Sequence, residues 1–146
     1  MRKPICSIMF ALLAMPAMAD GHASNQGDVA AGEAQFKRQC VACHLVADED
    51  GNVLAGRTAK VGPNLYGLAG RTIGSVDGFR YADSILEVQA TGTTWDEEKF
   101  VAFVQNPSNW LRETLDDRRA RSKMAYQVRQ EAQAYDIYAY LASLAE

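Results

Sequence analysis

The sequence predicts an all-α domain in which several helices and long loops surround one core. Apolar residues recur at helical spacing near the start of the chain, over residues 29–40, and again near its end, over residues 137–144. Residues 51–78 are rich in glycine and show little periodicity, which predicts a long loop. Because no part of the chain alternates strands with helices, a parallel α/β sheet is not indicated.

Caps and helix breakers place the individual helices. Asp28 can cap the first helix, and Gly32 within it would let the C-terminal helix cross closely because glycine has no side chain. Three more helices are expected between these two, at residues 81–88, 96–106 and 109–117. The middle one opens with three acidic residues and ends before Pro107.

The first 19 residues have the pattern of a cleaved secretory signal. Arg2 and Lys3 precede a short apolar run, and Ala17-Met18-Ala19 is a small-x-small cleavage pattern. Cleavage before Asp20 would leave a domain of residues 20–146, in which 13 basic residues stand against 18 acidic ones. This acidic balance argues against a nucleic-acid partner. An uncleaved membrane anchor is the alternative interpretation of the apolar run.

After the signal, the only cysteines are Cys40 and Cys43, and His44 follows them directly. The C-x-x-C-H pattern is typical of covalent haem attachment, in which two thiols add to the haem vinyl groups and the adjacent imidazole coordinates the iron. A disulfide is the ordinary use of two cysteines in an exported protein. A zinc site would need two more ligands, and only His22 remains as a further histidine or cysteine. A thioredoxin-like pair would need a βαβ pattern. Haem attachment is the favoured interpretation.

The second axial ligand can be found by elimination. Four of the five methionines lie within the predicted signal, so Met124 is the only thioether of the mature chain. A lone methionine is ordinarily core filler, but Met124 stands in a polar stretch. His22 would lie three residues from the new N-terminus, where disorder is common. We therefore expect His44 and Met124 as the two iron ligands, a pairing that suits electron transfer.

Further motifs occur in a fixed order along the chain: Gly27-Asp28-Val29, Val61 to Gly67, Gly70-Arg71-Thr72, Phe79-Arg80-Tyr81, Trp95, Asn106-Pro107, Lys123-Met124 and Ile137 to Leu141. With these motifs, the sequence from about Gly27 to Leu144 resembles the class I cytochromes c, specifically the bacterial cytochrome c2 group close to mitochondrial cytochrome c. The resemblance implies the class I cytochrome c fold, with helices and loops wrapped around one covalently bound haem c.

The resemblance also implies roles for residues around the haem. Pro63 would accept a hydrogen bond from His44 and so fix its ring. Four side chains would satisfy the haem propionates, which are costly to bury without donors: Arg71, Tyr81, Trp95 and Ser122. Three features depart from the mitochondrial pattern. Residues 48–52 lengthen the loop after the haem motif, residues 111–120 lengthen the segment before the methionine, and Phe103 stands where mitochondrial relatives carry a tyrosine.

The resemblance implies a soluble, monomeric, periplasmic electron carrier and not an enzyme. Electrons would come from a cytochrome bc1 complex and pass to a photosynthetic reaction centre or a terminal oxidase, and the sequence does not choose between these acceptors. Six cations flank the ligand-bearing segments and are expected to steer docking at the haem edge: Lys37, Arg38, Arg118, Arg119, Arg121 and Lys123. The alternative is a haem sensor or small peroxidase with an open sixth coordination site, or bis-histidine ligation through His22.

Overall fold

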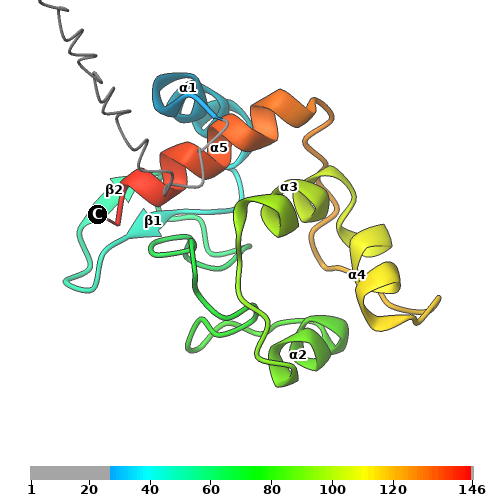
Figure 1. Ribbon diagram of the computed structural model, residues 1–146. Coiled ribbons are helices and arrows are strands. Elements are labelled where there is room, and N and C mark those ends of the chain that lie inside the picture. Colours follow the sequence, from blue (N-terminus) through cyan, green and yellow to red (C-terminus); the bar gives the residue numbers. More distant parts are fainter. Residues whose placement is uncertain (1–26, 146) are drawn as a thin grey trace, which may run out of the picture.

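The two terminal helices cross at Gly32. The computed structural model describes residues 27–145, so the predicted signal and His22 lie outside the described residues. Helix α1 (Val29–Gln39) begins at Asp28, whose carboxylate accepts a hydrogen bond from Ala31 N at 2.7 Å. Helix α5 (Glu131–Ser143) packs across it (Figure 1). A Cβ atom added to Gly32 would lie 1.9 Å from the Asp136 carbonyl oxygen, which confirms the expected close approach.

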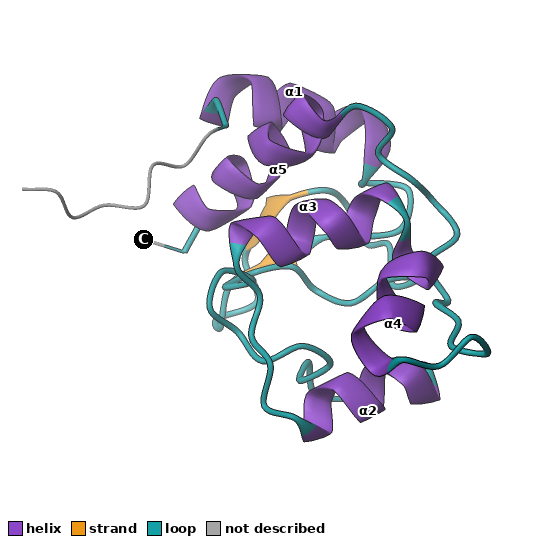
Figure 2. Ribbon diagram, turned by 45° about the vertical axis from the view of Figure 1, so that its right-hand side comes forward, coloured by secondary structure: helices purple, strands orange, loops and turns teal. Residues whose placement is uncertain are grey.

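Three further helices lie between the terminal pair, as expected, although the first of them begins two residues later than predicted. They are α2 (Asp83–Ala90), α3 (Glu97–Gln105) and α4 (Pro107–Leu115), and Figure 2 shows them around the loop-rich half of the molecule. Asp96 caps α3 through Lys99 N at 2.8 Å. The predicted start of α4 was two residues late. Asn106 ends α3 and also caps α4 through Asn109 N, which places Pro107 at the first helical position, where its missing N–H has no cost.

The glycine-rich segment is not entirely loop, which corrects the prediction for residues 51–78. Strands β1 (Val46–Ala47) and β2 (Val53–Ala55) pair antiparallel. The acidic loop between them is the hairpin turn: both Asp48 carboxylate oxygens accept hydrogen bonds from Asn52, at 2.8 and 2.9 Å, and Gly51 takes a φ of 85°. Strands of two and three residues are too short to produce a detectable alternation in sequence.

One apolar core joins the helices and the loops. Phe36, Ile137 and Leu141 are fully buried between α1 and α5, and Val88 and Leu111 are fully buried under α2 and α4. Ile73 and Val46 bring the long loop and the hairpin into the same core. In the described part of the chain, no helix is long and apolar enough to cross a membrane.

Candidate functional site

A cavity of about 500 Å³ lies between the helices and the long loop. Its lining is predominantly apolar, with side chains such as Leu65, Leu68, Ile85, Phe100 and Val128. All nine residues predicted from the sequence line it: Cys40, Cys43, His44, Pro63, Arg71, Tyr81, Trp95, Ser122 and Met124. The fold therefore brings together, in one cavity, residues that span more than half of the chain.

The end of helix α1 presents the two thiols and the imidazole. Helix α1 stops at Gln39, and the Cys40 carbonyl then accepts hydrogen bonds from Cys43 N at 3.0 Å and His44 N at 2.9 Å. This single turn keeps the three side chains close together. Both thiols are free, and burial, with a smaller contribution from Cys43, raises the pKa of the Cys40 thiol to about 12. Cys40 is therefore a protonated thiol at neutral pH.

The imidazole of His44 is fixed by the segment that crosses it. Its Nδ1 atom lies 2.9 Å from the Pro63 carbonyl oxygen. Gly62 N donates to the Cys43 carbonyl at 2.7 Å, and a Cβ atom on Gly62 would lie 2.2 Å from His44 Cε1. Burial lowers the pKa of His44, opposed by the hydrogen bond to Pro63. A neutral imidazole is the form that can donate a lone pair to a metal.

Met124 reaches the cavity from a segment, residues 117–130, that forms neither helix nor strand. The Met124 side chain is half-buried against the core, and its backbone N–H donates to Ser122 Oγ at 3.0 Å. Ser122 thus uses its hydroxyl as an acceptor toward Met124, and its own hydroxyl proton remains available to a group in the cavity.

Arg71, Tyr81 and Trp95 form the polar part of the lining. The Arg71 guanidinium donates to the carbonyls of Tyr66 and Asn64, and burial lowers the pKa of Arg71. Tyr81 accepts a hydrogen bond from Val76 N at 3.4 Å, and burial raises the pKa of its phenol, so the phenol stays a donor at neutral pH. Trp95 N donates to the Arg71 carbonyl at 2.9 Å, which ties these two residues to each other.

Asn64, within the Val61 to Gly67 motif, has a structural role that the sequence does not predict. The Asn64 side chain accepts from Ala47 N at 3.0 Å and donates to the Ala47 carbonyl at 2.7 Å. It therefore fastens the Pro63 segment to strand β1, which begins two residues after His44. A sequence signal was present, because an asparagine that directly follows Gly-Pro can hydrogen-bond to backbone groups, but its partner could not be known without the fold.

Comparisons with known proteins identify the architecture. The cytochrome c family model matches residues 29–145. Cytochrome c2 of Rhodovulum adriaticum is 56% identical over 118 residues, which cover 81% of this chain and 93% of the relative. Cytochrome c2 of Cereibacter sphaeroides is 43% identical over 136 residues, covering 92% and 90% of the two chains. The chain belongs to the class I cytochromes c, in the cytochrome c2 group.

Solved structures show the same relationship in three dimensions. The crystal structure of cytochrome c2 from Rhodobacter sphaeroides superposes with a TM-score of 0.79 at 44% identity, covering 82% of this chain and 97% of that one. Ferric cytochrome c-550 from Paracoccus versutus superposes with a TM-score of 0.76 at 39% identity, covering 82% and 99%. The class I cytochrome c fold expected from the sequence is confirmed.

Members of this family carry one covalently attached haem c, and the residues around the cavity fit that group. Two free thiols and one neutral imidazole stand together on one turn, as covalent attachment and axial ligation require. The remaining lining is largely apolar, with the donors of Arg71 and Tyr81 available for carboxylates. Because Gly62 has no side chain, it leaves space for the His44 imidazole ring, and a larger residue would occupy that space. The chain is a haem electron carrier.

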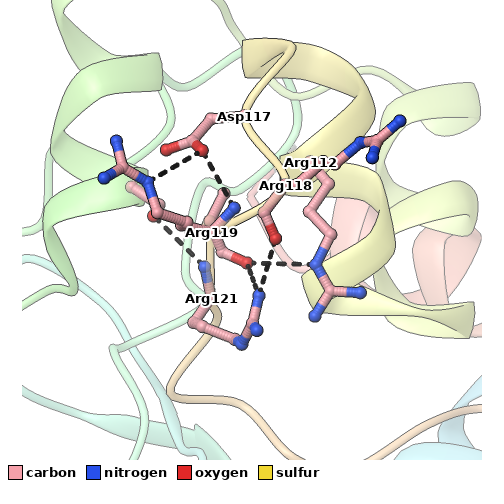
Figure 3. A network of polar contacts seen from close by, with 7 residues as sticks. Arg112, Asp117, Arg118, Arg119 and Arg121 are labelled. Carbon is pink, nitrogen blue, oxygen red and sulfur yellow. Dashed lines mark hydrogen bonds and ion pairs between the residues drawn. The ribbon is translucent and has the colours of Figure 1, made fainter.

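The six predicted docking cations are all exposed, but they do not all reach the cavity. Arg38 and Lys123 line it, whereas Lys37 pairs with Glu33 at 2.5 Å on the outer face of α1. Figure 3 shows Arg118, Arg119 and Arg121 in the turn after α4. Arg121 Nη1 donates to the Ala120 carbonyl at 2.9 Å, and Arg119 N donates to Asp117 at 2.9 Å. The backbone of this turn is therefore held by its own hydrogen bonds, and Arg118 and Arg119 are exposed on it.

Proposed function

We propose that this cytochrome is exported to the periplasm after cleavage of residues 1–19. There residues 20–146 would shuttle one electron at a time between membrane redox complexes. The donor is a cytochrome bc1 complex, and the acceptor is a photosynthetic reaction centre or a terminal oxidase. His44 and Met124 are the axial ligands, and Cys40 and Cys43 hold the haem. The observation that supports this most strongly is that all four side chains line one cavity.

The composition of the lining supports a carrier over a haem enzyme. A peroxidase or sensor needs an open iron position and usually a distal acid–base group. Among the described residues that line the cavity there is no Asp or Glu, and His44 is the only histidine. Met124 supplies a thioether in the place where an enzyme would need a vacancy. His/Met ligation also raises the reduction potential, which suits a carrier.

Docking is assigned to the exposed cations beside the cavity. Arg38 and Lys123 stand at the cavity itself, and Arg118 and Arg119 extend the positive surface along the turn after α4. Residues 20–146 carry 13 basic and 18 acidic residues, a net charge of −5, so this local positive region would orient the molecule toward an acidic partner. Such steering acts mainly on the association rate and is weakened by salt.

Replacing the proposed sixth ligand tests the function. The Met124→Ala variant should bind carbon monoxide when reduced and should have a lower reduction potential than the unchanged protein. Tyr126→Phe is the matched control, because it alters the same segment but removes only a hydroxyl that donates to Gln39 at 3.0 Å. A Met124→Ala protein with an unchanged potential and no carbon monoxide binding would contradict the assignment.

A further inference from the structure

The segment that carries Met124 is held mainly by serine hydroxyls. Its backbone N–H groups donate to three of them: Arg121 N to Ser84 Oγ at 3.3 Å, Ser122 N to Ser108 Oγ at 3.1 Å, and Met124 N to Ser122 Oγ at 3.0 Å. Within residues 27–145, no backbone amide between Ala120 and Val128 donates to a backbone carbonyl. Regular backbone pairing therefore does not hold this stretch in place.

Two of these serines lie on two neighbouring helices of the core, α2 and α4. Ser84 lies in the first turn of α2 and Ser108 in the first turn of α4, and the two helices pack against each other (Figure 2). Leu111 of α4 and Val88 of α2 are fully buried, which fixes both helices to the core. The hydroxyls therefore stand at fixed points beside the non-helical backbone that carries the thioether. Neither serine lines the cavity.

Side chains of the segment make further contacts, and Tyr126 Oη donates to Gln39 Oε1 at 3.0 Å. Lys123 Nζ donates to the carbonyls of Arg80 and Tyr81, at 2.7 and 3.0 Å, and this side chain is exposed. On the far side, Val128 N donates to the Val104 carbonyl at 2.9 Å. Ser84 and Ser108 are both half-buried, so water competes less well for their bonds than for those of Lys123.

We propose that Ser84 and Ser108 are positioning residues for the Met124 thioether: they hold the 121–124 backbone against α2 and α4 and thereby keep the sixth coordination position closed. This inference rests on the proposed ligation by Met124. Removal of either hydroxyl leaves one backbone N–H without its acceptor. It should raise the population of the open, methionine-detached state by about 2- to 10-fold, as expected for one neutral hydrogen bond.

Imidazole binding to the ferric holoprotein tests the proposal, because imidazole enters only when the sixth position is open. Ser84→Ala and Ser108→Ala should each bind imidazole about 2- to 10-fold more tightly than the unchanged protein, and the double variant more tightly again. Ser143→Ala is the matched control, since its hydroxyl donates to the Tyr140 carbonyl within α5, far along the chain from the ligand segment. The control should bind imidazole as the unchanged protein does.

Denaturant unfolding of the unchanged protein and the same four variants separates local opening from global loss of stability. Each serine variant should bind imidazole more tightly than Ser143→Ala, even where the two proteins have the same denaturant midpoint of unfolding. Imidazole affinities equal to that of Ser143→Ala, with the thioether-to-iron charge-transfer band present, would overturn this inference alone. Absence of that band from the unchanged protein would overturn the proposed Met124 ligation and this inference together.

Discussion

The Pro63 carbonyl oxygen and the His44 Nδ1 atom lie 2.9 Å apart, and this contact determines which nitrogen of the imidazole ring keeps a free lone pair. A carbonyl can only accept a hydrogen bond, so Nδ1 must carry the proton. The lone pair of the neutral imidazole is then on Nε2, the atom available to iron. Such a partner fixes the orientation of a ligating histidine and increases its basicity.

The close contact between Gly62 and the His44 ring predicts that Gly62→Ala strongly disturbs the position of the imidazole. The new Cβ would lie 2.2 Å from His44 Cε1 and 2.5 Å from Nδ1, so the ring must move away from its place. The yield of correctly ligated holoprotein should fall strongly, measured as the absorbance ratio of haem to protein after purification. Val61→Ala is the control, because Val61 is the adjacent residue and is 74% exposed. Normal haem content and spectrum in Gly62→Ala would show that the ring tolerates displacement.

The crossing of the terminal helices predicts a loss of stability in Gly32→Ala. Alanine improves helix propensity by about 1 kcal/mol, but its Cβ would lie 1.9 Å from the Asp136 carbonyl oxygen. Overpacking should win, with a net loss of roughly 1–3 kcal/mol in the free energy of unfolding by denaturant. Ala34→Gly, an exposed exchange in the same helix, measures propensity alone and should cost about 1 kcal/mol. A Gly32→Ala protein more stable than the parent would refute the close crossing.

Haem attachment should be required for folding. The cavity of about 500 Å³ is lined by core residues such as Leu68, Ile85 and Val104, which have no packing partner on that side without the haem. The Cys40→Ala/Cys43→Ala double variant, freed of haem, should therefore show much less helix by far-ultraviolet circular dichroism. The single variant Cys40→Ala retains one attachment point and should keep most of its helix. Native-like helix content in the haem-free double variant would contradict this expectation.

The positive charges of Arg118 and Arg119, in the turn after α4, should increase the rate of electron transfer with the partner complex at low ionic strength. Arg118→Gln/Arg119→Gln should lower the second-order rate with a purified cytochrome bc1 complex by about 3- to 10-fold, and the difference should vanish at high salt. Lys123 is kept, because its Nζ also bonds to the backbone of Arg80 and Tyr81. Arg57→Gln, an exposed cation that does not line the cavity, is the control. Equal rates in the double variant and the control would remove these arginines from the docking surface.

Much of this architecture could be predicted because its signals are local. Asp28 as a cap, Gly32 as a crossing point and the Cys40–His44 motif each depend on neighbours within a few residues. The hairpin at residues 46–55 was missed because its pairing depends on a turn held by Asp48 and Asn52, and the strands themselves are too short to detect. Helix α4 was placed late because Pro107 indicates both the end of one helix and the start of the next.

The site shows the same division. Met124 could be singled out by elimination, and Pro63 as the partner of His44 by the family resemblance. The partners that hold Pro63 and Met124 in place through other segments could not be identified from the sequence. Asn64 acts on Ala47, 17 residues away, and Ser84 acts on Arg121, 37 residues away. Nothing in the composition of either neighbourhood indicates these partners, because the contacts exist only after the loops have folded around the core.

The most direct measurement is the visible and near-infrared spectrum of the purified protein in both oxidation states, with carbon monoxide added to the reduced form. A thioether-to-ferric-iron charge-transfer band, together with no carbon monoxide binding, is the predicted result and corresponds to His44/Met124 ligation in an electron carrier. Ready binding of carbon monoxide by the unchanged protein, with no such band, would mean an open sixth position and would contradict the account.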